Sequence, residues 1–367
     1  MGGLATDDVL DAARRIDGRV RRVQVIRDDR EGRWLALEYM QHTGSFKARG
    51  AQSLLSAHRE AGALPEAGVT IVSGGNAGLA CAWAARSQGV SATVFLPTTA
   101  PAVKVARLRG YGAEVQLVGA EYAEAAEASE AFARESCALR SHAYDNRLIA
   151  AGAGTIVGEI RAQAPDVETI FVSVGGGGLF AGVATAAAGY GIRVVAVEPE
   201  RCCALHAALE AGKPIDVTGD SVAADSLGAR RATALAVDAA QRGDARSLLV
   251  SDGEIIAARR AMWEERRIVV EHGTAAALAG LAAYRPAEGE GIVVLSSCAG
   301  RTLIPATSFR NRTRQNAGGG PRVRFRLEAG GAASAATNPG PETPFPDSPN
   351  HGTARRRRGC SARRRRR

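Results

Sequence analysis

Apolar strands alternate with helix-length segments along most of this chain, and that alternation limits the folds it can adopt. Three strand-then-helix repeats occupy residues 69 to 143, and a second series of strands and helices follows from residue 152 to 295. Strands that are joined through helices pair in parallel, and helices then cover both faces of the sheet. The sequence therefore predicts an α/β protein with two open parallel-sheet domains.

The apolar periodicity also places the individual elements. Strands are expected at residues 34–40, 69–73, 91–96, 114–118, 139–143, 169–174, 193–197 and 292–295. Helices are expected at residues 5–16, 77–88, 101–110, 121–137, 152–163, 178–188, 203–211, 229–241, 253–266 and 273–284, the first with Thr6 as its N-cap. We divide the chain into a large domain of residues 1–53 and 148–309, a small α/β domain of residues 54–147, and a tail of residues 310–367.

The positive net charge of +9 comes from this C-terminal tail. Residues 310 to 367 hold 15 Arg against three acidic residues, a balance of +12, which leaves −3 for residues 1 to 309. The tail is rich in Gly, Pro and Ala and has no apolar periodicity, so we expect it to be disordered. Nucleic-acid binding by its Arg blocks is the alternative, but we favour a non-functional extension.

Cysteine usage and the N-terminus bear on the cellular compartment. None of the six cysteines is spaced as CxxC, and a chain of 367 residues does not need disulfides to fold, so reduced thiols in the cytoplasm are expected. Acidic and basic residues within the first 16 positions exclude a signal-peptide core. No apolar run reaches the roughly 18 residues that a membrane span requires.

One lysine, Lys47, stands in a turn of small residues within the segment Thr-Gly-Ser-Phe-Lys-Ala-Arg-Gly at positions 43–50. The residues after it could open a helix, and both the positive end of a helix dipole and burial disfavour a charged amine. A neutral amine is what Schiff-base chemistry needs. Lys47 is therefore a candidate for holding a covalent cofactor, although this segment alone would also fit a surface lysine. Arg49 could pair with an acid or with a cofactor oxygen.

Two glycine-containing loops follow predicted strands. Residues 73–78, Ser-Gly-Gly-Asn-Ala-Gly, offer donors before a helix start, which suits a carboxylate. Residues 175–178 are four glycines between a strand and a helix, and such a nest of N–H groups fits a phosphate.

The four-glycine loop has a competing interpretation. Gly176, Gly178 and Ala181 fit the dinucleotide pattern GxGxxA, and Glu198 ends the next strand 22 residues after Gly176. A nicotinamide enzyme, however, has no use for a lysine turn and an asparagine loop elsewhere in the chain. Pyridoxal phosphate uses all three segments, as amine, ring support and phosphate cradle.

Together these segments resemble the motifs of the pyridoxal-phosphate enzymes of the tryptophan synthase β fold, specifically the serine/threonine dehydratases. The resemblance covers residues 15 to 305, with the motifs in the family's order. It implies that Lys47 carries the cofactor, that Phe46 packs on its ring and that Asn76 bonds the ring hydroxyl. The implied phosphate ligands are the N–H groups of Gly175, Gly176, Gly177, Gly178 and Leu179, and the implied substrate-carboxylate contacts are Ser73, Asn76 and Ala77.

The last predicted strand departs from this family pattern. Relatives end it with Ser or Cys before a Gly-Gly-Asn or Gly-Ala-Asn turn, and that side chain meets the pyridine nitrogen. Here Leu295 is followed by Ser-Ser-Cys-Ala-Gly-Arg. Aligning from the strand selects Ser296, whereas matching the cysteine selects Cys298, with Ser297 between them. Because the asparagine of the turn is missing, a catalytically impaired binding homologue stays open as an alternative.

A cation site is a further implication of the resemblance. Similar enzymes bind a potassium or magnesium ion with a glutamate and main-chain carbonyl groups, and Glu198 opens a Glu-Pro-Glu sequence at the corresponding place. Oxygen ligands suit such a hard cation. A strand-ending glutamate that only caps or pairs fits equally well.

The resemblance implies a β-elimination that converts L-threonine or L-serine to 2-oxobutanoate or pyruvate plus ammonia. The sequence does not choose between these two substrates. A racemase, or a lyase for another β-hydroxy amino acid, is the alternative. We expect a cytoplasmic homodimer with a small amino-acid substrate and without a membrane or nucleic-acid partner.

Overall fold

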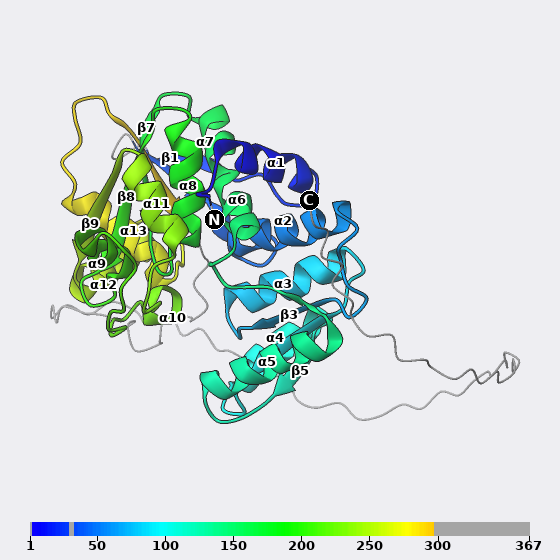
Figure 1. Cartoon of the computed structure of the whole chain (residues 1–367). Coiled ribbons are helices and arrows are strands. Elements are labelled where there is room, and N and C mark those ends of the chain that lie inside the picture. Colours follow the sequence, from blue (N-terminus) through cyan, green and yellow to red (C-terminus); the bar gives the residue numbers. More distant parts are fainter. Residues whose placement is uncertain (1, 29–32, 297–367) are drawn as a thin grey trace, which may run out of the picture. The chain divides into compact units, whose positions relative to one another are not determined.

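The computed structural model describes residues 2–28 and 33–296 (Figure 1). The strands are β1 (Val25–Asp28), β2 (Arg33–Leu37), β3 (Val69–Val72), β4 (Ala92–Leu96), β5 (Glu114–Leu117), β6 (Leu139–Arg140), β7 (Val167–Ser173), β8 (Arg193–Pro199), β9 (Ala245–Val250) and β10 (Gly291–Ser296). The helices are α1 (Thr6–Ile16), η1 (Glu38–Met40), α2 (Lys47–Glu60), α3 (Asn76–Ser87), α4 (Ala102–Gly110), α5 (Tyr122–Ser136), α6 (Arg147–Gly154), α7 (Ile156–Gln163), α8 (Gly178–Ala188), α9 (Ala204–Ala211), α10 (Ala224–Leu227), α11 (Ala234–Arg242), α12 (Asp252–Arg266) and α13 (His272–Ala283). The predicted tail and the candidates Ser297 and Cys298 lie outside the described residues.

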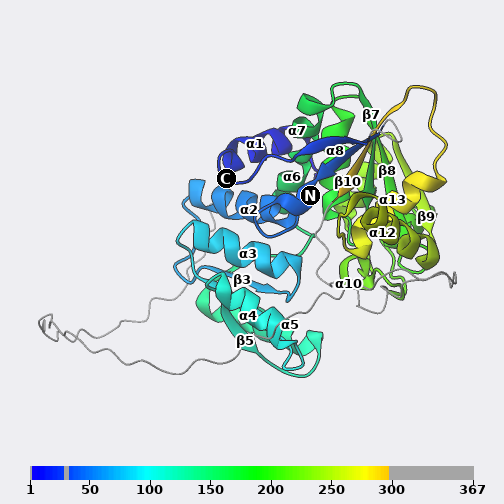
Figure 2. The ribbon, with the colours of Figure 1, turned by 180° about the vertical axis from the view of Figure 1, so that it is seen from behind.

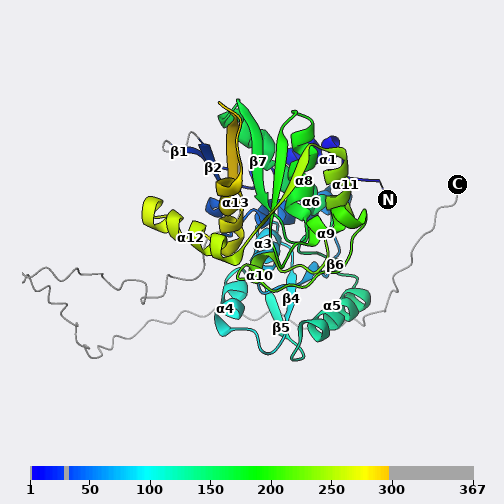
Figure 3. The same ribbon diagram turned by 90° about the vertical axis from the view of Figure 1, so that its left-hand side faces the viewer.

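A six-stranded sheet has the order β1-β2-β10-β7-β8-β9. Its strands are parallel except for β1, which pairs antiparallel with β2 at one edge. Nearly every residue of β7 and β10 is buried, as expected for strands that are covered on both faces. Helices α6, α8 and α11 pack on one face of this sheet, and α12 and α13 pack on the other (Figure 3).

A four-stranded parallel sheet has the order β5-β4-β3-β6. Its apolar core joins β3, β4 and α3, and it reaches Ala51 and Leu55 of α2. Figures 1 and 2 show α3 beside α2, so this sheet and the lysine-bearing helix belong to adjoining layers. The described residues all belong to one compact unit, and the domain boundaries near residues 53 and 147 stay a prediction.

The structure differs from the expected elements in a few places. The expected helix 152–163 is the end of α6 followed by α7, and Thr155 joins the two. Thr6 is the first residue of α1 and not its N-cap, because Ala5 holds the cap position and its N–H donates to the Asp8 carboxylate at 2.7 Å. The expected strand 34–40 ends at Leu37, and η1 continues the chain.

Two strands, β1 and β9, were not predicted from the sequence. They are the edge strands of the six-stranded sheet and are only partly buried, so they lack the continuous apolar run that marks the central strands. Among the described residues, no helix has the length and apolar character needed to cross a membrane.

Candidate active site

Three neighbouring parallel strands bring separate parts of the sequence to one edge of the large sheet. Strand β10 lies between β2 and β7, and Ser296 at its end is in register with Leu37 at the end of β2. The lysine turn follows β2 through η1, and the four-glycine loop follows β7. Ligands of open α/β sheets bind at this carboxyl edge. The predicted lysine attachment, the predicted contact of Ser296 with the ring nitrogen and the predicted phosphate contacts therefore all lie at this edge.

Lys47 is the first residue of α2 and is half-buried. Gly44 enters the preceding turn with a φ of 75°, a value that favours glycine. The Lys47 Nζ donates to the main-chain oxygen of Ala143 at 2.5 Å and lies 4.8 Å from the centre of the buried Phe46 ring. The amine is therefore oriented by a carbonyl group and an aromatic ring.

The asparagine loop lies between β3 and α3 of the smaller sheet. Asn76 is the first residue of α3, and its Nδ2 donates to the Glu271 carboxylate at 3.1 Å. Ser73 Oγ accepts the N–H of Gly75 at 3.2 Å, and Ala77 is buried. Glu271 is a residue that the sequence did not indicate. Glu271 is the N-cap residue of α13, which packs on the large sheet, so its bond to Asn76 links the small-sheet loop to that helix.

The four-glycine loop requires glycine for steric reasons. Gly177 has a φ of 92° and is the N-cap of α8. A Cβ added at Gly176 would overlap the Tyr144 ring, and one at Gly178 would lie 2.5 Å from the Tyr144 main-chain oxygen. The first N–H groups of a helix have no intrahelical partner, so Gly178 and Leu179 offer donors at the positive end of α8, which suits a phosphate.

Residues 142–144 were not predicted to take part, yet they contact both the lysine and the glycine loop. Ala143 accepts from Lys47, and Tyr144 covers Gly176 and Gly178. His142 accepts the N–H groups of Tyr144 and Asp145 on its Nδ1, at 3.2 and 2.8 Å. Burial, supplemented by the nearby Lys47 charge, lowers the pKa of His142 even though Asp145 opposes the shift. The neutral form of His142 is thereby favoured.

Ser296 ends β10 with only 2% of its surface exposed, and its Oγ is buried without a hydrogen-bond partner. Thr43 Oγ1 and Ser45 Oγ, in the lysine turn, are also buried and unsatisfied. An unsatisfied buried hydroxyl costs free energy unless a ligand supplies its partner. A pyridine nitrogen would supply one for Ser296. The amine, the glycine cradle and this hydroxyl therefore fit pyridoxal phosphate.

Glu198 lies at the end of β8 and is fully buried. Its two carboxylate oxygens accept the N–H groups of Leu205 and His206, each at 2.8 Å, so it binds the first turn of α9. Burial raises the pKa of Glu198 to about 7 despite these two bonds. Within the described ranges, no group of three or more His, Cys, Asp and Glu side chains could hold a metal. The cation role of Glu198 stays a prediction.

Comparison with known proteins gives three kinds of match. The family model described as "Pyridoxal-phosphate dependent enzyme" matches residues 22–298. A biosynthetic L-threonine dehydratase of Haemophilus influenzae is 35% identical over 256 residues, and an L-threonine ammonia-lyase of Geobacter sulfurreducens is 34% identical over 299 residues. The crystal structure of serine racemase from Dictyostelium discoideum is similar with a TM-score of 0.75 and 27% sequence identity.

The matches differ in how much of each protein they cover. The aligned part is 68% of this chain and 49% of the Haemophilus protein, and 78% of this chain and 74% of the Geobacter protein. The racemase comparison covers 82% of this chain and 99% of that structure. This chain thus spans about half the length of the Haemophilus dehydratase that it matches.

Proposed function

The chain belongs to the family of pyridoxal-phosphate dependent enzymes, and on this premise we propose that it eliminates water from L-threonine or L-serine. The products would be 2-oxobutanoate or pyruvate, each with ammonia. The family match confirms the predicted cofactor, and the structural match confirms the predicted α/β fold. The substrate proposal is supported by the names of two relatives, a threonine dehydratase and a threonine ammonia-lyase.

One observation carries the proposal: three adjacent strands of the large sheet end in the lysine turn, Ser296 and the four-glycine loop. When bound, pyridoxal phosphate supplies an electron sink for the charge that develops at the substrate Cα. We assign covalent attachment to Lys47, phosphate binding to the N–H groups of residues 175–179, and contact with the ring nitrogen to Ser296. A hydroxyl is a weaker acid than a carboxylic acid, so the serine does not favour a protonated ring nitrogen.

The chain's own residues would then divide the remaining work. The Lys47 amine would take the Cα proton, and the Ala143 carbonyl that it contacts would keep the amine in place. Ser73, Asn76 and Ala77 hold the substrate carboxylate at the start of α3. The Glu271 carboxylate orients the Asn76 amide. The β-hydroxyl leaves as water, and hydrolysis of the released product gives the 2-oxo acid and ammonia.

A second candidate is racemisation of serine, favoured by the structural match to a serine racemase. Both reactions begin with loss of the Cα proton. They differ in whether the β-hydroxyl leaves or a proton returns to the opposite face. The two candidates therefore separate by product and not by the first step.

The test is to incubate purified protein and cofactor with L-threonine and L-serine, and to measure 2-oxo acid, ammonia and D-amino acid. Equal amounts of 2-oxo acid and ammonia support the elimination. D-Serine without 2-oxo acid would support the racemase instead. If a yellow, cofactor-loaded protein forms none of these products from either amino acid, both candidates are wrong, and another β-hydroxy amino acid or a binding role should be examined.

We further propose that the enzyme is a cytoplasmic homodimer with no nucleic-acid partner. Light scattering of the purified protein should give twice the chain mass of 38.1 kDa. A monomer mass would contradict the dimer. A gel shift that disappears on deletion after Phe309 would show that the tail binds nucleic acid.

A further inference from the structure

Arg49 is a fully buried arginine whose guanidinium is saturated by hydrogen bonds. It binds Glu38 through Nε and Nη2, at 3.0 and 2.7 Å, and it binds Glu159 through Nη1 and Nη2, both at 2.8 Å. Two further bonds go to Thr155 Oγ1 at 3.1 Å and to the main-chain oxygen of Arg21 at 3.2 Å. These bonds occupy the N–H groups of a side chain that is 0% exposed, so Arg49 pairs with acids and has no donor left for a cofactor oxygen.

These bonds join elements that surround the lysine turn. Glu38 begins η1 directly after β2, where Leu37 is in register with Ser296 of β10. Glu159 belongs to α7, and Thr155 joins α6 to α7. One side chain of α2 therefore ties that helix to the carboxyl end of β2 and to the α6–α7 junction.

Close packing of α2 on α6 allows Arg49 to reach these partners. A Cβ added at Gly50 would lie 2.7 Å from Cγ2 of Ile149, and one at Gly152 would lie 2.7 Å from the main-chain oxygen of Arg49. Both positions thus need glycine for the two helices to approach this closely. Gly50 thus permits the close packing of α2 on α6 that brings Arg49 to its partners.

Lys47 and Arg49 point to different sides of α2. Residues two positions apart on an α-helix are separated by about 200° of rotation. Arg49 therefore lies on the side of the first turn opposite to Lys47, whose amine reaches Ala143. Phe46, the N-cap residue, gives the turn no side-chain cap. Arg49 therefore supplies this turn with side-chain hydrogen bonds that a cap does not provide.

The charges in this cluster argue for a specific role. Burial alone would lower the pKa of Arg49, but Glu38 and Glu159 together raise it above its ordinary value. The cluster sets one guanidinium against two carboxyl groups, and burial raises the pKa of Glu38 although Arg49 opposes the shift. Buried ion pairs of this kind contribute little net stability compared with apolar packing and are better suited to fixing one geometry.

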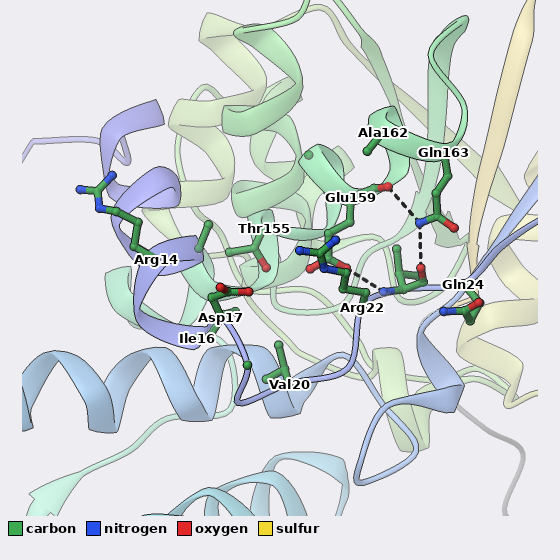
Figure 4. A pocket seen from close by; sticks show the side chains of 14 residues that line it. Arg14, Ile16, Asp17, Val20, Arg22, Gln24, Thr155, Glu159, Ala162 and Gln163 are labelled. Atoms are coloured by element: carbon green, nitrogen blue, oxygen red, sulfur yellow. Dashed lines mark hydrogen bonds between the residues drawn. The ribbon is translucent and has the colours of Figure 1, made fainter.

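The cluster reaches solvent through a cavity of about 640 Å³ between α1, α7 and the segment that joins α1 to β1 (Figure 4). Thr155 and Glu159, both partners of Arg49, line this cavity. The Glu159 side chain is 23% exposed, whereas those of Arg49 and Glu38 are 0% and 1% exposed. Glu159 is therefore the partner that can be changed without leaving a fully buried charge unpaired.

We propose that Arg49 is a positioning residue that fixes the first turn of α2, and through it the Lys47 amine, relative to the carboxyl edge of the large sheet. The inference rests on the proposed function only in taking Lys47 as the cofactor lysine. Arg49 itself contacts no reacting atom. Its loss should displace the amine, and a displacement of about 1 Å can cost about a hundredfold in rate.

The experiment compares R49K and E159Q with R266K. Lysine keeps one charge at position 49 but cannot bind two carboxylates in bidentate fashion. Arg266 pairs with Asp28 in another partly buried ion pair, at the end of β1 opposite the lysine turn. R266K is therefore a matched control for loss of an arginine ion pair without a change near Lys47.

Two readouts are needed besides stability. The first is the fraction of Lys47 that borohydride links to pyridoxal phosphate, measured by peptide mapping over a series of cofactor concentrations. The second is kcat and KM for the 2-oxo acid reaction. Thermal unfolding of each cofactor-free variant shows that it is folded.

For R49K we expect the cofactor concentration needed for half-maximal linkage at Lys47 to rise about ten- to hundredfold, and kcat to fall by a similar factor. KM should change less than kcat, because the substrate contacts of α3 remain. E159Q should show the same pattern at a few-fold level, and it carries the test if R49K does not fold. R266K should lower thermal stability only.

The proposal is wrong if R49K and E159Q lose stability as R266K does but link cofactor at Lys47 like the wild type. It is also wrong if the wild type is not labelled at Lys47. A wild type that is labelled at Lys47 but forms no 2-oxo acid contradicts the proposed reaction alone, and the linkage readout then still decides the role of Arg49.

Discussion

The two sheets contribute to the candidate site in different ways. The six-stranded sheet supplies Lys47, Ser296 and the four-glycine loop from three adjacent strand ends. The four-stranded sheet supplies the asparagine loop after β3, whose Asn76 is tied by a hydrogen bond to Glu271 at 3.1 Å. It also supplies residues 142–144 after β6, which contact Lys47 and the four-glycine loop. We therefore propose that the large sheet holds the amine-linked end and the phosphate of the cofactor, and that the small sheet contacts the substrate and, through Asn76, the ring hydroxyl.

Close packing constrains both loops. A side chain at Gly176 would overlap the Tyr144 ring, whereas a Cβ added at Gly75 would meet only Ser73 Oγ at an ordinary 3.7 Å. Both loops nevertheless require glycine, because a Cβ added at Gly78 of the asparagine loop would lie 1.8 Å from the main-chain oxygen of Ser73. We expect changes in the four-glycine loop to weaken cofactor binding, and changes in the asparagine loop to weaken substrate use.

The largest effect is expected for K47A. Loss of the amine removes both the attachment point and the proton acceptor, so kcat/KM should fall by roughly 10²- to 10⁴-fold. The measurement is the rate of 2-oxo acid formation. K213A, which removes an exposed lysine, serves as the control and should behave as the wild type. Equal rates for K47A and the wild type would contradict both proposed roles of Lys47.

The second-largest effect is expected for G176A, because its new methyl group and the Tyr144 ring cannot share the same space. We expect the protein to fold but to bind pyridoxal phosphate at least about tenfold more weakly, since the phosphate cradle must open. Absorbance titration with cofactor measures this. G158A, at a glycine of α7 with no atom within 4 Å of the added Cβ, is the matched control. Unchanged cofactor affinity in G176A would contradict the cradle.

Glu198 provides a pH-dependent test on the large sheet. Burial raises its pKa from 4.5 to about 7 in the folded protein. Between these values the folded state binds more protons than the unfolded state, so the free energy of unfolding should fall as pH rises and level off above pH 7. The contribution is at most about 3 kcal/mol.

Denaturant unfolding between pH 5 and 8 measures how the free energy of unfolding changes with pH, and E198Q should reduce that change. A potassium ion bound by Glu198 would lower the pKa of the carboxyl group and so reduce the same change, because the cation favours the charged carboxylate. An unchanged slope in E198Q would mean that another group titrates.

The smallest effect is expected for N76A on the small sheet. Removing one side-chain amide should lower kcat/KM by about tenfold, the size of one hydrogen bond to a charged group, and leave the cofactor attached to Lys47. E271Q, which keeps an acceptor for the Asn76 amide, should lose less. If N76A lost the cofactor as G176A does, the proposed division between the sheets would be wrong.

The sequence was most informative where a local pattern determines the structure. The helix expected at 178–188 is α8 without change, because four glycines and an apolar run define its start and its burial. The lysine turn and the asparagine loop also lie at the strand-to-helix connections that were predicted. Each of these features depends on residues close together in the chain.

The missed features depend on residues far apart. Glu271 meets Asn76 across 195 positions, and Ala143 meets Lys47 across 96. No local periodicity reports such pairs. Arg49 shows the same limit, since its pairing with Glu159 at a separation of 110 residues requires the close packing of α2 on α6.

Borohydride reduction of the cofactor-loaded protein, followed by peptide mapping, tests the central claim most directly. We predict one modified residue, Lys47, in the peptide that also contains Phe46. K47A should give no modified peptide under the same conditions. Label at Lys104 or Lys213 in place of Lys47, or an unlabelled Lys47 in protein that holds the cofactor, would contradict attachment of the cofactor to Lys47.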